Sequence, residues 1–155
     1  MTTDRFNEAK KTLLHAMLED KEHCPESVRA VRSCKTIKNL VCVLNSFMSA
    51  MKHKRFPNAD YMRKFFIDEL ELINKFGIYI DQEVNIIDKP NTWLFGKCTG
   101  SVSSTKIEIQ RIVINDDSAI TINALPWSIQ IIHVKSKQAI IHNNKANNAR
   151  QIIVR

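Results

Sequence analysis

The sequence predicts an α+β protein in which an N-terminal helical head of three to four helices (residues 1–76) packs on a C-terminal β-repeat tail (residues 77–155), which is a short β-solenoid or an antiparallel β-meander. Apolar residues recur every three or four positions up to Phe76. After Gly77 they alternate with polar residues, as in strands with one buried face. Three ten-residue lines then follow one another (115–124, 125–134 and 135–144), sharing a polar residue in the fourth column and mostly apolar residues in the seventh and eighth. The two parts form either two domains or one cooperative domain.

The first helix is predicted from Asp4 to about Glu22, where apolar residues form one stripe. The stripe consists of Phe6, Ala9, Leu13, Met17 and Leu18. A second, shorter helix begins at Pro25, because proline fits the first turn of a helix, and it continues through Val31.

Ser33 or Thr36 is expected to cap a third helix, whose apolar face continues to Met51. The Phe56-Pro57-Asn58 segment interrupts the helical pattern. A fourth helix is then predicted from Tyr61 to Phe76, and the glycine that follows is able to close it in the left-handed conformation.

The segment 78–87 (IYIDQEVNII) predicts one strand, and Lys89-Pro90-Asn91 predicts a turn. From Thr105 onward, β-branched residues dominate between short polar breaks. A ten-residue spacing suits either successive strands of an antiparallel meander or the half-coils of a solenoid, and we favour the solenoid. Equivalent positions would then stack in two columns: Ala119, Ile129, Ala139 and Ala149 in one, and Ile122, Ile132, His142 and Ile152 in the other.

The composition is that of a folded globular protein, with 44% hydrophobic and 25% charged residues, and its net charge of +7 is unevenly distributed. Residues 28–64 contain nine basic side chains and a single acidic one, Asp60. Residues 118–155 contain five basic side chains and no carboxylate side chain. Two basic tracts are therefore separated by a more acidic segment.

No sequence motif indicates catalysis or a bound cofactor. The four cysteines (Cys24, Cys34, Cys42 and Cys98) lack the paired spacing of a zinc or redox motif, so we expect free thiols. His133 and His142 could approach on neighbouring rungs, but structural roles are expected for them and for Asp116-Asp117. There is no nucleophile elbow and no glycine-rich phosphate loop. We therefore expect a protein that is not an enzyme and has no metal and no cofactor.

The candidate site is a set of nine basic residues, which we expect to bind nucleic acid or a partner. They are Lys52, Lys54, Arg55, Arg63, Lys64, Arg29, Arg32, Lys35 and Lys38. The first three close the predicted third helix and the next two begin the fourth, so a helical hairpin would gather them. Trp93 and Trp127 are expected to be buried aromatic residues.

The run 56-FPNADYMRKFFIDELELINKFGIYIDQEV-84, the connector GKCTGSVS (96–103) and the repeated lines resemble a group of small proteins from phages and mobile elements of gut Bacteroidales. The resemblance covers roughly the last two-thirds of the chain, and its motifs are architectural. It implies the context of an accessory gene, among which proteins that interfere with host systems are frequent. It transfers no activity and no site residue.

Together, these observations favour a non-enzymatic binding protein of a phage or mobile element that engages nucleic acid or a nucleoprotein complex, acting as an anti-CRISPR-like inhibitor of host defence. The alternative is a protein–protein interaction or oligomerisation module that uses the edge of the β tail to bind a host protein or another copy. A third hypothesis is a small hydrolase, which would require Asp116, Asp117, His133 and His142 to converge in a cleft. The first residues show no export-signal pattern, and no later stretch of the sequence is apolar over a length that would span a membrane. We therefore expect no membrane association and a location in the cytoplasm of the bacterial host.

Overall fold

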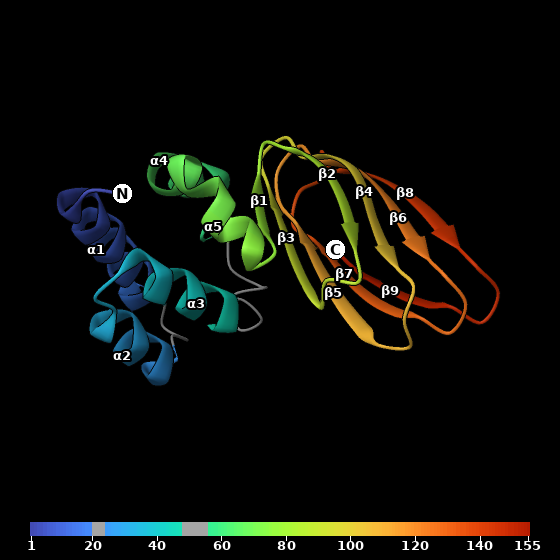
Figure 1. The fold of residues 1–155 in the computed structure, drawn as a ribbon, viewed down its shortest axis with the longest axis horizontal. Helices are drawn as coiled ribbons and strands as arrows, with labels where there is room; N and C mark the ends of the chain where they lie inside the picture. Colours follow the sequence, from blue (N-terminus) through green and yellow to red (C-terminus); the bar gives the residue numbers. More distant parts are fainter. Residues whose placement is uncertain (20–23, 48–55) are drawn as a thin grey trace. The chain divides into compact units, whose positions relative to one another are not determined.

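The computed structural model describes residues 1–19, 24–47 and 56–155, and the chain divides into two compact units, Met1–Phe76 and Gly77–Arg155 (Figure 1). The first unit is helical and the second contains the strands. The helices are α1 (Thr3–Glu19), α2 (Pro25–Ser33), α3 (Ile37–Phe47), α4 (Ala59–Phe66), the 3₁₀ turn η1 (Ile67–Glu69) and α5 (Leu70–Lys75).

Helix α1 buries Ala9, Leu13 and Met17 of the predicted apolar stripe, whereas Phe6 is partly buried and Leu18 is 48% exposed. Ala9 and Leu13 are fully buried on this face. The Tyr61 hydroxyl of α4 donates a hydrogen bond of 3.1 Å to the carbonyl of Ala9, and the Tyr61 ring centroid lies 5.1 Å from that of Phe65. Burial raises the pKa of Tyr61, so the hydroxyl remains a hydrogen-bond donor in this core.

Of the two caps considered for α3, the structure uses Thr36. Its Oγ1 accepts a hydrogen bond of 3.2 Å from the amide of Asn39, whereas Ser33 belongs to α2 and donates its hydroxyl to the carbonyl of Ala30. The predicted extensions of the first helix to Glu22 and of the third helix to Met51 lie outside the described residues.

The segment predicted as one fourth helix is divided. Asn58 Oδ1 accepts a hydrogen bond of 2.9 Å from the Tyr61 amide, so α4 begins at Ala59. The 3₁₀ turn η1 then interrupts the helix before α5 continues to Lys75. Apolar spacing alone could not reveal this change of pitch, because short 3₁₀ turns keep similar side-chain spacing.

The second unit contains nine strands. They are β1 (Ile78–Ile80), β2 (Glu83–Ile87), β3 (Asn91–Phe95), β4 (Thr99–Ser104), β5 (Ile109–Ile114), β6 (Ala119–Ala124), β7 (Ile129–Val134), β8 (Ile140–Lys145) and β9 (Arg150–Val154). Odd-numbered strands form one parallel sheet in the order β1-β3-β5-β7-β9, which we call sheet A. Even-numbered strands form a second parallel sheet in the order β2-β4-β6-β8, which we call sheet B.

This topology corrects the predicted fold class, which left an antiparallel β-meander open. Every strand pair in residues 77–155 is parallel, and the chain alternates between the two sheets, so the tail is a β-solenoid of four two-stranded coils followed by β9 (Figure 1). The antiparallel meander is wrong because each of its strands would pair with the next strand in sequence. Here each strand pairs instead with the strand two positions away.

The predicted stacking columns are also wrong. Each ten-residue line is half a coil, so successive lines lie on opposite sheets and equivalent positions stack only at every second line. Ile132 of β7 pairs with Ile112 and Ile153, whereas Ile122 of β6 pairs with Val102 and Asn143.

The interior of the solenoid is mainly apolar, and it includes a column of glutamine side chains. The apolar core cluster consists of Val84, Ile86, Leu94, Cys98, Val102, Ile112, Ile114, Ile120, Ile122, Ile132 and Val134. Gln130 is fully buried in sheet A, and its Nε2 donates a hydrogen bond of 2.8 Å to Gln110 Oε1. Gln151 Nε2 donates in turn to Gln130 Oε1 at 2.9 Å. The amides of three successive coils are thus joined inside the solenoid.

Aspartates in the left-handed conformation turn the chain at several corners. Asp81 has a φ of 50°, and it separates β1 from β2, so the single strand predicted for 78–87 is two strands. Its carboxylate accepts a hydrogen bond of 2.7 Å from the Lys97 amide of the next coil. Asp88 accepts similarly from the Thr105 amide at 2.6 Å. These carboxylates therefore connect one coil to the next.

Candidate functional site

Six of the nine basic residues of the predicted site can be placed. Lys52, Lys54 and Arg55 lie outside the described residues. Arg63 and Lys64 lie on α4, and the other four lie on α2, on the connection that follows it and on the start of α3.

The four residues on α2 and α3 are all exposed, and we call them the α2–α3 cationic surface. They are Arg29, Arg32, Lys35 and Lys38. Arg29 and Arg32 share one face of α2, because they are three residues apart, while Val28 and Val31 are buried on the other face. Lys35 lies in the connection and Lys38 in the first turn of α3.

Few carboxylates of the described residues compensate this surface. Arg29 is close to Glu26, whose pKa is lowered chiefly by a hydrogen bond from the Cys24 thiol and to a smaller extent by Arg29. Arg32, Lys35 and Lys38 form no ion pair within the described parts of the chain. Positive charge therefore remains available on this part of the helical unit.

Arg63 and Lys64 differ, because each faces a carboxylate. Arg63 Nη1 lies 3.2 Å from Asp60 Oδ1, and Lys64 Nζ lies 2.6 Å from Glu8 Oε1. Both residues belong to the last turn of α4 rather than to the start of the fourth helix, as the hairpin hypothesis assumed. Their charge is compensated locally.

The N-terminus of α3 adds to the positive character of the cationic surface. Helices α1, α2 and α4 each have an acidic residue in the first turn, whereas α3 has none and has Lys38 there. An acidic side chain would offset the partial positive charge of the first helical amides. Without one, this end of α3 favours an anion from outside the chain.

Among the described residues, the cysteines and the histidines give no sign of a catalytic or metal site. Burial raises the pKa of both Cys34 and Cys98. Across residues 1–19, 24–47 and 56–155, no group of three or more His, Cys, Asp or Glu side chains is placed to hold a metal ion. His133 lies in sheet A and His142 in sheet B. Both occupy outward positions of the alternating pattern, so they point away from each other and do not converge in one cleft.

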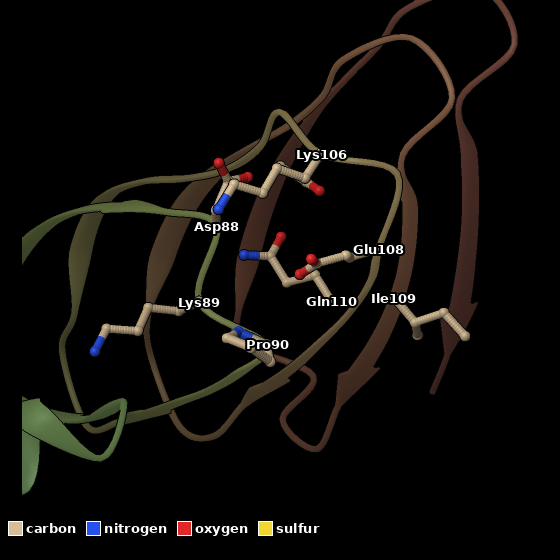
Figure 2. A pocket seen from close by; sticks show the side chains of 8 residues that line it. Asp88, Lys89, Pro90, Lys106, Glu108, Ile109 and Gln110 are labelled. Carbon is tan, nitrogen blue, oxygen red and sulfur yellow. The ribbon is translucent and has the colours of Figure 1, made fainter.

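A small pocket lies where β2 passes to β3 and β4 passes to β5 (Figure 2). Its lining includes Asp88, Lys106, Glu108 and Gln110. Its volume of about 10 Å³ is close to the space of one water, whereas sites for small molecules commonly measure roughly 300–1,000 Å³. The Asp88 carboxylate is already bonded to Thr105, which lowers the pKa of Asp88. This pocket is therefore part of a corner and is too small for a substrate.

Sequence reasoning missed an exposed apolar surface at the neighbouring corner. Trp93 is buried as expected, but Trp127 is 61% exposed, so the expectation is wrong for Trp127. The sequence signalled a turn at Leu125-Pro126-Trp127-Ser128, because proline is common in the second position of turns, but proline does not distinguish type I from type II, in which φ of the third residue is positive. Trp127 has a φ of 69°.

The edge of the β tail, which the alternative hypothesis uses, is apolar in the last coil. Ile112, Ile132 and Ile153 occupy one inward column; the first two are fully buried and Ile153 is 42% exposed. Binding at this edge stays a prediction.

The fold defines a chain with a helical unit and a parallel β-solenoid unit. No protein-family model matches it, and neither does any curated protein or any solved structure. In the part of the chain that the structure describes, no helix has the length and apolar character needed to cross a bilayer.

Proposed function

We propose that the protein is a non-enzymatic binding protein that engages nucleic acid, alone or within a nucleoprotein complex, through the α2–α3 cationic surface. The observation that supports this proposal is the exposure of Arg32, Lys35 and Lys38 without a carboxylate partner among the described residues. Arg63 and Lys64 of the predicted site face carboxylates. The proposed surface therefore contains fewer basic residues than the predicted site.

The physical basis is phosphate neutralisation. Each Lys or Arg that contacts a phosphate releases condensed counterions, which makes binding favourable at low salt. Arginine adds a planar donor pair that matches two phosphate oxygens. Arg32 and Lys38 lie on either side of a short connection, so the surface presents both kinds of donor within a few residues.

The resemblance of 56–84 and of the repeated lines to proteins of phages and mobile elements supports a narrower form of the proposal. In that form the target is a nucleoprotein complex of a bacterial host, and binding inhibits it, as an anti-CRISPR protein does. The cationic surface would then bind the nucleic-acid component of the complex.

Titration with fluorescent single-stranded and double-stranded oligonucleotides at several salt concentrations tests the proposal. We expect the logarithm of the binding constant to fall linearly with the logarithm of the salt concentration, by about 0.9 per phosphate neutralised in B-DNA. Replacing Arg32, Lys35 and Lys38 by alanine should reduce this slope by about one for each phosphate that the variant no longer neutralises.

The matched control replaces three exposed lysines of the solenoid unit, Lys97, Lys106 and Lys137, by alanine, because this variant has the same net charge. Equal reductions of affinity in both triple variants would show that total charge and not this surface governs binding, and an absence of binding at low salt would reject the proposal. A variant with Lys52, Lys54 and Arg55 replaced by alanine tests the part of the predicted site that lies outside the described residues.

A further inference from the structure

Trp127 occupies a turn position that disfavours its side chain. The carbonyl of Leu125 accepts a hydrogen bond of 3.1 Å from the Ser128 amide, with Pro126 second in the turn and Trp127 third. The φ of 69° at Trp127 is typical of the third position of a type II turn, where glycine or asparagine is preferred. In the next coil the equivalent turn, closed by Ala146 and Ala149, has Asn148 in this position with a φ of 65°.

Burial does not explain why tryptophan stands there. All other described residues with positive φ are glycine, aspartate or asparagine, which tolerate this conformation. Trp127 is 61% exposed, so it recovers little of the free energy that burying an aromatic ring provides. A strained, exposed aromatic residue is therefore better explained by an interaction with another molecule than by the stability of the fold.

Trp127 belongs to an exposed apolar surface. The connection between β4 and β5 is the equivalent corner of the preceding coil, because Ser104 pairs with Ala124 and Ile109 pairs with Ile129. This corner exposes Ile107 (79%) and Ile109 (45%), and the turn of Trp127 exposes Leu125 (45%). We call Ile107, Ile109, Leu125 and Trp127 the Trp127 surface. Exposed apolar residues gathered at neighbouring corners of successive coils are candidates for an interaction site.

Cations bracket this surface on the side of the following coil. Lys145 pairs in register with Ala124, and Arg150 pairs with Ile129, so the two cations lie at the two ends of the equivalent turn in the next coil, beside the turn that carries Trp127. Both are exposed, and no carboxylate side chain occurs from 118 to 155. Toward the following coil the surface therefore has a positive rim, while Glu108 lies between Ile107 and Ile109 on the preceding coil.

We propose that the Trp127 surface docks an acidic, apolar segment of a partner protein, with the apolar side chains of the segment on Trp127 and its carboxylates facing Lys145 and Arg150. Charge complementarity selects this occupant. A second copy of the chain, bound through the same surface by two-fold symmetry, would bring the same cations together. Nucleic acid fits less well, because Ile107, Ile109 and Leu125 are aliphatic and offer no aromatic ring on which a base could stack.

The test uses arrays of short synthetic peptides in which Leu and Phe alternate with Asp and Glu. One matched array has Lys and Arg in place of the acidic residues, and another has Ser in place of the apolar ones. We expect the full chain to bind selectively to the acidic, apolar array. Trp127→Asn should weaken this binding roughly tenfold or more, as expected for an aromatic hot spot, while leaving the fold intact because asparagine suits the turn. Reversing both cations (Lys145→Glu with Arg150→Glu) should shift the preference to the basic array.

Ile140→Asn is the matched control, because Ile140 is a similarly exposed apolar residue at the start of β8, on a different corner. It should leave peptide binding unchanged. Equal binding by wild type and Trp127→Asn would overturn the proposal, as would equal binding to acidic and basic arrays. Two other outcomes would overturn the proposal. In the first, single-stranded oligonucleotides quench tryptophan emission and the peptides do not. In the second, the chain forms a dimer that Trp127→Asn abolishes. The variant in which Arg32, Lys35 and Lys38 are replaced by alanine should bind the peptides as wild type does. This result separates the proposal from nucleic-acid binding by the helical unit.

Discussion

Lys135 is a basic residue of the solenoid whose side chain is partly buried. Burial lowers the pKa of Lys135 from its ordinary value of 10.5 to about 8, although nearby Asp116 opposes the shift. Its ammonium group lies 5.8 Å from the centroid of the Trp93 ring. This cation–π contact stabilises the charged ammonium less than full hydration would.

This shift predicts a pH dependence of stability. Between about pH 8 and 10.5 the unfolded chain keeps the Lys135 proton while the folded chain has lost it, so this residue makes the free energy of unfolding rise with pH in that window. We expect Lys135→Met to be more stable than wild type at pH 7 and this difference to vanish above pH 10.5. Urea unfolding across this pH range measures the difference. Lys137→Met, at an exposed position two residues away, is the control and should show no such trend. A difference between Lys135→Met and wild type that stays constant with pH would contradict the assignment.

At the scale of single residues, sequence predicted apolar burial better than polar burial. Ile122 and Ile132, which the sequence analysis assigned to an apolar column, are both fully buried, although they lie in different sheets. The column of Gln110, Gln130 and Gln151 could not be recognised, because its amides satisfy one another only when the three residues stack in successive coils. That stacking depends on the parallel register, which the ten-residue spacing left open.

At the scale of elements, a close approach of two strands depends on one glycine. Gly100 of β4 lies opposite Val84 of β2, and its φ is 109°. A Cβ atom on Gly100 would lie 2.1 Å from the Val84 carbonyl oxygen, so the strands could not keep their spacing. The first two coils are thus joined at a position that excludes any other side chain.

We therefore expect Gly100→Ala to lower the free energy of unfolding of the solenoid unit by about 2 kcal/mol or more, from backbone strain together with the displaced carbonyl. Denaturant unfolding followed by tryptophan emission measures this change, because both tryptophans lie in the solenoid unit. Thr99→Ala, in the same strand at an exposed position, should change stability by less than about 0.5 kcal/mol. If the two variants proved equally stable, the close contact between β2 and β4 would be refuted.

The elements also show why the fold could be predicted only in part. The change from helical to alternating periodicity near Gly77 was sufficient to predict helices first and strands second. The direction of the strands was not accessible, because a strand of six residues followed by a short turn occurs in meanders and in solenoids alike. The left-handed Asp81, which divides the first predicted strand, also went unnoticed within an otherwise regular alternation.

At the scale of the whole molecule, the sequence showed where basic charge is concentrated but not which part of it is compensated. Arg63 and Lys64 seemed equivalent to Arg32 and Lys35 in the sequence. Only the three-dimensional arrangement brings Glu8, which is far away in sequence, to within 2.6 Å of Lys64. Likewise, Trp127 was expected in the core because tryptophan usually lies there, and its exposure depends on a turn whose geometry was not anticipated.

Each unit has its own buried core, which predicts separate unfolding of the two units. Leu13 is fully buried in the helical unit and Ile122 in the solenoid unit. Leu13→Ala should destabilise the helical unit by about 3 kcal/mol, shifting the loss of the helical circular-dichroism signal and leaving the transition in tryptophan emission in place. Ile122→Ala should shift the tryptophan transition instead. If each variant shifted both unfolding transitions together, the chain would be one cooperative domain. A substitution in the core of one unit lowers the stability of the other unit only when the two units unfold in a single transition.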